Sequence, residues 1–215
     1  MSAETQSVRY RPLSPFNIGL LVIAGLCSLV FFVGFAVPYL AFETDVLARF
    51  DGRTFWIVSH VLTGSIALFV GGPQLWMGLT GKTGTAHHKL GWIYLATIAL
   101  SSITSFYLAV TTNVSWVFGL GLGGLGLAWV IAGTLALVAI LKRNYFQHME
   151  WMIRSYVVTL GFVFFRLFVG VAEGLEVGTL IERLSAASWI CWALPLLVTE
   201  ATMQGKKIFS DRKAT

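Results

Sequence analysis

Ionisable and other polar side chains within apolar stretches are the groups in this 215-residue sequence that could carry out chemistry. Such groups are costly in hydrocarbon, so they usually face a protein interior, where they form a functional site or a buried polar contact. One set lies close to the start of two apolar segments and comprises His87, His88 and His148. A second set lies on two of the segments and comprises His60, Gln74, Arg166 and Glu173.

The first set has the residue type that binds haem iron and other transition metals. His88 and His148 are expected near the same membrane face on two different helices, where facing imidazoles can share one metal ion. His87, next to His88, is a further candidate for cofactor binding. The structural alternative is that these histidines lie in hydrated loops among basic residues, contacting lipid phosphates or capping helices. The spacing leaves both interpretations open.

The second set predicts a polar pocket. Arg166 and Glu173 are seven residues apart, which places them on one helical face, about two turns from each other. Arg166 lies too deep to reach water easily, so it needs a carboxylate, a carbonyl or a bound anion. His60 reaches a comparable depth from another helix. Gln74 lies further along that helix, on the same face as His60. We expect a pocket for substrate or protons that opens to the outer side; the alternative is a structural contact between helices.

The elements that position these residues are long apolar segments. Hydrophobic residues make up 56% of the chain and charged residues only 12%, about half the charged share of a soluble domain. Six segments are long enough to cross about 30 Å of hydrocarbon as helices. We predict an all-α fold and one transmembrane domain over residues 1–215. Its six transmembrane helices are expected at about 16–42, 55–79, 89–111, 115–141, 151–174 and 185–203.

Lysine and arginine indicate how this bundle is oriented in the lipid bilayer. Apart from Arg154 and Arg166, which lie within a predicted helix, three fall on one side: Arg49, Arg53 and Arg183. Ten fall on the other side: Arg9, Arg11, Lys82, Lys89, Lys142, Arg143, Lys206, Lys207, Arg212 and Lys213. The richer side is expected to be cytoplasmic, which places both termini there (N-in/C-in). This distribution explains the net charge of +5 without a nucleic-acid partner.

Glycines are concentrated in the segment 115–141. Gly119 and Gly123 have the small-xxx-small spacing that lets a neighbouring helix approach closely. The string around them follows no strand and lies in an apolar membrane segment, so it is not a nucleotide-binding fingerprint. We predict a packing role for these glycines.

Two sequence strings are similar to a known family. They are His88-Lys-Leu-Gly-Trp-Ile-Tyr94 and His148-Met-Glu-Trp-Met-Ile-Arg-Ser-Tyr156. With His60 before them and Arg166 after them, they resemble a bacterial family of multi-pass membrane proteins catalogued only as a domain of unknown function. The resemblance implies a helical bundle in the bacterial inner membrane and supplies no activity.

A more remote likeness links the chain to transmembrane di-haem cytochromes b, which pass electrons across a membrane. That family has four axial histidines on helices 2 to 5, and the predicted fourth helix has none. One inner haem b is therefore the most that this likeness implies. The leading hypothesis is a haem b electron-transfer protein with His88 and His148 as ligands. The alternatives are a small transporter or quinone-like ligand binder, and an assembly or scaffold protein. Whether the chain is an enzyme stays open.

Overall fold

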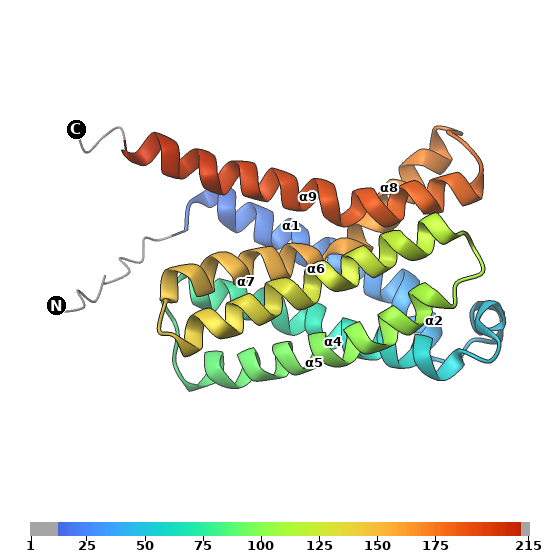
Figure 1. Ribbon diagram of the computed structural model, residues 1–215, viewed down its shortest axis with the longest axis horizontal. Helices are drawn as coiled ribbons and strands as arrows, with labels where there is room; N and C mark the ends of the chain where they lie inside the picture. Colours follow the sequence, from blue (N-terminus) through green and yellow to red (C-terminus); the bar gives the residue numbers. More distant parts are fainter. Residues whose placement is uncertain (1–12, 212–215) are drawn as a thin grey trace.

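Long helices dominate the computed structural model, which describes residues 13–211 (Figure 1). Within that range there is no β-strand. Four helices are uninterrupted: α4 (Thr54–Leu79), α5 (Thr85–Val110), α6 (Trp116–Leu141) and α9 (Leu180–Asp211). The first span is compound, because α1 (Pro15–Phe31) continues through a π-helical turn, η1 (Phe32–Ala36), into α2 (Val37–Leu40). The connection that follows carries α3 (Thr44–Leu47) and a 3-10 turn, η2 (Ala48–Phe50).

The fifth span is bent. Helices α7 (Tyr145–Thr159) and α8 (Gly161–Gly174) meet at an angle of 40°, separated only by Leu160. Five helices in the described range are long and apolar enough to cross a membrane, and the bent pair makes six when it is counted as one span. The predicted six-helix membrane bundle is confirmed.

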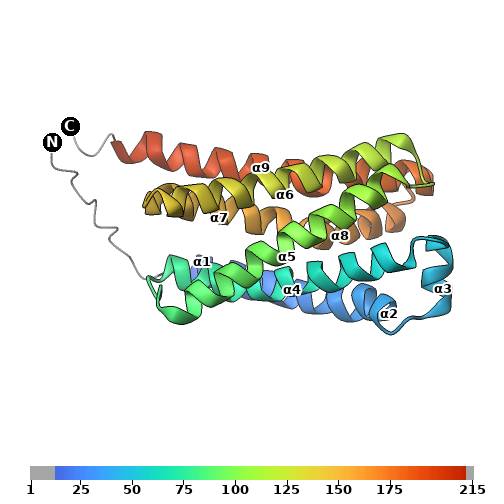
Figure 2. The ribbon, with the colours of Figure 1, turned by 60° about the horizontal axis from the view of Figure 1, so that its bottom comes forward.

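The two ends of the bundle differ in charge. The start of α1 and the end of α9 lie at the same end, as Figures 1 and 2 show together. We call this the basic end, because six of the predicted cytoplasmic residues lie at or near it: Lys82, Lys89, Lys142, Arg143, Lys206 and Lys207. The residues Arg9, Arg11, Arg212 and Lys213 lie outside the described range. The opposite end carries Arg49, Arg53 and Arg183. Which end faces the cytoplasm remains a prediction.

Hydrogen bonds between side chains tie three helices together at the centre of the bundle. The Tyr94 hydroxyl of α5 lies 3.0 Å from Ser155 Oγ and 2.8 Å from Thr159 Oγ1, both on α7. Trp129 of α6 donates its indole N–H to the same Thr159 hydroxyl at 2.9 Å. Tyr94 and Ser155 are fully buried. Because each polar group has a partner, these residues can be buried without a large desolvation cost.

Most glycines of α6 pack closely against other helices. A Cβ atom at Gly119 would lie 2.6 Å from the Ala109 carbonyl oxygen. One at Gly121 would lie 2.8 Å from Ser188 Cβ on α9. Gly123 has no neighbouring atom within 4 Å of such a position. The packing role is therefore found at Gly119 and Gly121, whereas Gly123, the predicted second member of the spaced pair, does not take part.

Candidate functional site

A pocket of about 790 Å³ lies at the basic end between α4, α5, α6 and α7. His87, His88 and His148 all line this pocket, which we call the inner pocket because it lies at the end predicted to be cytoplasmic. His87 and His88 come from the first turn of α5, and their ring centroids are 6.1 Å apart. His148 comes from the first turn of α7, which begins there because the Asn144 side chain accepts a hydrogen bond from the Gln147 N–H.

His148 is held in one orientation by the backbone of α6. Its Nδ1 lies 2.9 Å from the Ala136 carbonyl oxygen. A carbonyl only accepts, so Nδ1 carries the proton and Nε2 keeps a free lone pair. Histidines that bind metals are commonly fixed by such a hydrogen bond from the other ring nitrogen. The side chain is therefore prepared to act as a ligand through Nε2.

Gln74 belongs to this inner pocket. Its Nε2 lies 3.4 Å from His87 Nε2, while Gln74 Oε1 and His87 Nδ1 are buried without a hydrogen-bond partner among the described residues. The sequence grouped Gln74 with His60 because they share a face of α4. Fourteen residues of helix separate them by about 21 Å, so one face of the helix serves two different pockets.

The inner pocket is not built like a site for a bare metal ion. Within residues 13–211, no three histidine, cysteine, aspartate or glutamate side chains gather closely enough to hold one. A protein site for zinc usually needs three or four such ligands. Any metal bound here would therefore have to bring most of its own ligands.

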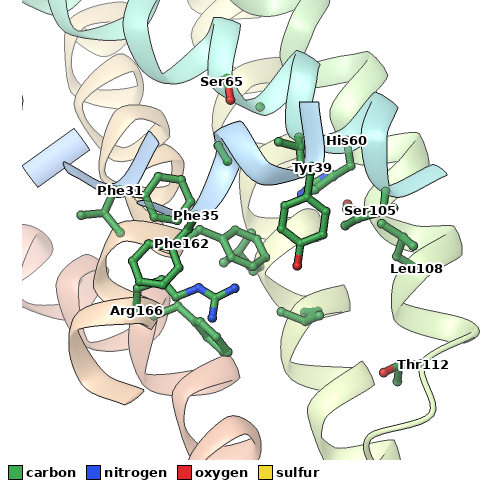
Figure 3. A pocket seen from close by; sticks show the side chains of 18 of the residues that line it. Phe31, Phe35, Tyr39, His60, Ser65, Ser105, Leu108, Thr112, Phe162 and Arg166 are labelled. Carbon is green, nitrogen blue, oxygen red and sulfur yellow. The ribbon is translucent and has the colours of Figure 1, made fainter. Parts of the chain in front are cut away.

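A second cavity, of about 340 Å³, runs from the opposite end of the bundle to the bend between α7 and α8. His60 and Arg166 both line it, from α4 and α8 (Figure 3). Glu173, which the sequence placed in the same pocket, is not among the lining residues. It lies about two turns further along α8, where its side chain is exposed.

Arg166 lies over aromatic rings inside this cavity. Its guanidinium carbon is 4.6 Å from the centre of the Phe35 ring and 5.8 Å from that of Phe165. The Tyr39 hydroxyl points toward it from α2 (Figure 3). The Nε atom is buried and has no hydrogen-bond partner in the described part of the chain. A buried donor without a partner is costly, which indicates that this atom is available to a ligand or to water.

His60 is held against α5 where it lines the same cavity. Its Nδ1 lies 3.1 Å from both the carbonyl oxygen and the hydroxyl oxygen of Ser101. The ring lies edge-on to Phe162, with 5.8 Å between the ring centres. The cavity thus combines a cationic side chain that has one unpartnered donor, an imidazole and aromatic walls.

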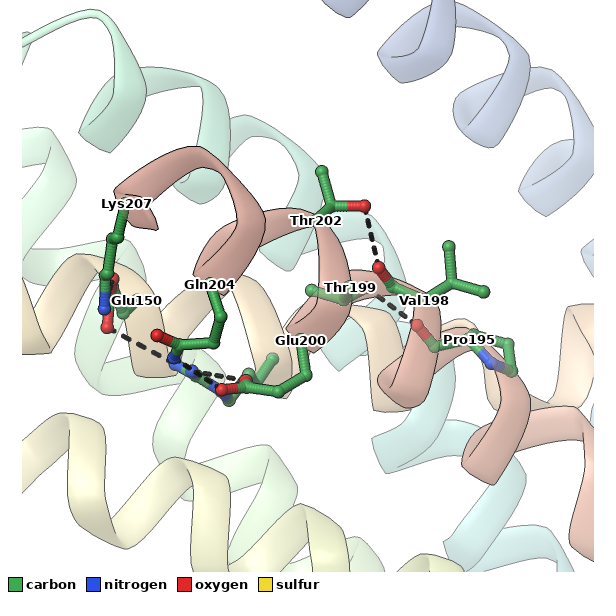
Figure 4. A network of polar contacts seen from close by, with 9 residues as sticks. Glu150, Pro195, Val198, Thr199, Glu200, Thr202, Gln204 and Lys207 are labelled. Atoms are coloured by element: carbon green, nitrogen blue, oxygen red, sulfur yellow. Dashed lines mark hydrogen bonds and ion pairs between the residues drawn. The ribbon is translucent and has the colours of Figure 1, made fainter. Parts of the chain in front are cut away.

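An ion-pair network that the sequence did not predict joins α7 to α9 at the basic end (Figure 4). Glu150, which is 5% exposed, contacts Lys207 Nζ at 2.7 Å and Arg154 Nη1 at 3.8 Å. Arg154 also donates from Nε to Glu200 Oε2 at 2.8 Å, and Gln204 donates to the other oxygen of Glu200 at 2.6 Å. The i,i+4 spacing of Glu150 and Arg154 was the available signal.

Apolar helices of this length, with polar groups facing the interior, define a multi-pass membrane protein. The family model described as "Predicted membrane protein (DUF2306)" matches residues 57–203. The chain belongs to this family, and the predicted resemblance to a membrane family of unknown function is confirmed. No curated protein and no solved structure matches the chain. The likeness to di-haem cytochromes b finds no support in these comparisons.

Proposed function

We propose that the protein binds one haem b in the pocket at its basic end and serves there as a one-electron carrier. The observation that carries this proposal is that His87, His88 and His148, from two helices, line one pocket of about 790 Å³. This volume is within the range of about 300–1,000 Å³ found for small-molecule and cofactor sites.

The ligand set favours haem over a bare metal ion. The porphyrin supplies four nitrogen ligands, so the protein has to provide only one or two axial ligands. Helices α5 and α7 both direct imidazoles into the pocket, whereas no cluster of three ligands exists among the described residues. Apolar side chains such as Leu75, Leu95 and Met152 line the remainder, as a macrocycle with apolar faces requires.

His148 is the first proposed ligand, because its Nδ1 hydrogen bond to Ala136 leaves Nε2 free. The second ligand comes from the adjacent pair on α5. His88 is the exposed member and His87 the partly buried one. Bound haem supplies one-electron redox chemistry. A single haem at one end supports exchange with a partner on that side, without a second centre to carry electrons across the bilayer.

The proposed location is the bacterial inner membrane, with the basic end in the cytoplasm. It rests on the family resemblance and on the distribution of lysine and arginine between the two ends.

Optical spectroscopy of the purified protein tests the haem proposal. The protein, isolated from haem-supplemented cells, should show a Soret band that shifts on reduction with dithionite. His148→Ala should abolish the band, and one of His87→Ala and His88→Ala should do the same. His60→Ala is the matched control, because it removes a partly buried histidine outside the pocket, and it should retain the band. A folded wild-type protein that takes up no haem, or retention of the band in all three pocket variants, would refute the proposal.

The transporter or quinone-like ligand binder stays a second candidate, because the Arg166 guanidinium lines the cavity at the opposite end and its buried Nε has no hydrogen-bond partner among the described residues. Binding of a small molecule there does not depend on haem at the basic end. The third prediction, an assembly or scaffold protein, would apply if neither pocket bound a ligand.

A further inference from the structure

We propose that the cavity at the opposite end binds a single-chain anionic amphiphile, whose carboxylate-type head contacts Arg166 and whose apolar chain extends toward the bend between α7 and α8. The site uses none of the residues assigned to haem, so the two proposals are independent and can be tested separately.

The charge of the cavity selects for an anion. Three arginines line it: Arg49, Arg53 and Arg166. Among the described residues, no aspartate or glutamate does. Arg53 is engaged with the backbone, donating to the carbonyl oxygens of Thr111 and Arg49. Arg166 keeps a buried Nε without a partner. A neutral ligand would accept a hydrogen bond but would leave this cation uncompensated in an apolar site, whereas a carboxylate meets both requirements.

The arginines also mark a path for the anion. Arg49 is exposed in the connection that follows α3, and it lies close enough to Arg166 for their charges to interact. An anion approaching from the opposite end would meet Arg49 first and Arg166 further in. The Tyr39 hydroxyl beside the Arg166 guanidinium offers an additional donor to the head group (Figure 3).

The inner part of the cavity suits an apolar chain. Its walls there are formed by Leu68, Leu122, Leu125, Val158 and Phe162. Burying methylene groups against such side chains is favourable. The volume of about 340 Å³ lies near the lower limit for small-molecule sites. It therefore favours one chain over the two chains of a phospholipid.

The first experiment uses the wild-type protein in a non-ionic detergent and compares three probes by isothermal titration calorimetry. Dodecanoate has the proposed head and chain, methyl dodecanoate has the chain without the charge, and decylubiquinone is a neutral quinone with a similar tail. Dodecanoate should bind at least tenfold more tightly than its methyl ester. Equal binding of acid and ester, no binding of dodecanoate, or tighter binding of the quinone would overturn the proposal.

The second experiment changes the arginine. Arg166→Gln should weaken dodecanoate binding by at least tenfold, and Arg166→Lys should restore part of the affinity, because it keeps the charge but not the fork of donors. Arg183→Gln is the charge-matched control, since Arg183 lies at the same end but does not line the cavity, and it should bind normally. A folded Arg166→Gln protein with unchanged affinity would overturn the proposal. If that variant does not fold, the comparison of dodecanoate with its methyl ester on the wild-type protein tests the proposal.

The independence of the two sites can be measured directly. His148→Ala should bind dodecanoate as the wild type does, and Arg166→Gln should retain the Soret band. Loss of dodecanoate binding in a folded His148→Ala protein would show that the acid binds at the basic end, contrary to the proposal.

Discussion

Replacing Gly71 with alanine tests how closely α4, α5 and α7 are packed. A Cβ atom at this position would lie 2.6 and 2.7 Å from two ring carbons of Tyr156 and 2.8 Å from a ring carbon of Tyr94. Carbon atoms in favourable contact are about 3.5–4.0 Å apart. At least one tyrosine ring would therefore have to move by about 1 Å.

The cost of that movement can be estimated from the contacts that hold the rings. Tyr94 contacts the hydroxyls of Ser155 and Thr159, and Tyr156 donates to the Leu68 carbonyl at 3.4 Å. Overpacking a core typically costs about 1–3 kcal/mol, and a weakened hydrogen bond adds about 0.5–1.5 kcal/mol. The higher helix propensity of alanine offsets up to about 1 kcal/mol. The net destabilisation is about 2 kcal/mol, equivalent to a fall in Tm of about 4–8 °C for a chain of this size.

Thermal unfolding in detergent, followed by tryptophan fluorescence, measures this effect. Gly170→Ala on α8 is the matched control, because a Cβ atom there has no neighbour within 4 Å, and its Tm should stay the same or rise slightly. The double variant Gly71→Ala with Tyr156→Leu should be less destabilised than the sum of the single variants, because the smaller side chain removes most of the clash. Equal Tm values for the two alanine variants would refute the packing argument.

Two further predictions concern the basic end. Arg154→Met should lower the Tm clearly more than Lys142→Met, because Arg154 pairs with both Glu150 and Glu200, whereas Lys142 is exposed. Glu150 keeps its closer contact with Lys207 at 2.7 Å, so the cost should stay below the figure of about 3–5 kcal/mol for a buried charge that loses its partner. Similar Tm values would contradict a stabilising network. A topology reporter fused after Thr215 should score as cytoplasmic, and one inserted in the segment 43–53 should score as non-cytoplasmic. The reason is the ten-to-three bias of lysine and arginine between the two ends. The same score at both positions would contradict the predicted orientation.

The helices could be predicted because apolar runs of about 20 residues have few alternatives in a membrane. Their polar ends could not be located in the same way. The fifth span begins at Tyr145, six residues before the predicted start, and α9 continues to Asp211, eight residues beyond the predicted end. These extensions are helical because Asn144 caps α7 and Lys207 pairs with Glu150. Hydropathy does not detect such contacts.

The sequence predicts which residues share an end of the bundle wherever the direction of each helix is enough to place them. His87, His88 and His148 lie near the ends of helices that meet at one end of the bundle, and this follows from counting the spans. The contribution of the first span to the other cavity did not follow, because Phe35 and Tyr39 are ordinary residues of an apolar helix. Their place beside Arg166 depends on which helices pack together. Glu173 was grouped with Arg166 because the two share a helical face, but the two turns of helix between them place Glu173 outside the cavity.

The string from His148 to Tyr156 shows why a family motif is weak evidence for a cofactor. Its residues contact four other helices: His148 contacts α6, Glu150 and Arg154 contact α9, Ser155 contacts α5, and Tyr156 contacts α4. Most of the string is thus accounted for by packing of α7 at the centre of the bundle. Of these five, only His148 lines the inner pocket. Replacing Arg154 or Tyr156 should therefore lower stability whatever the pocket binds, while replacing His148 should remove the proposed haem ligand from a protein that still folds.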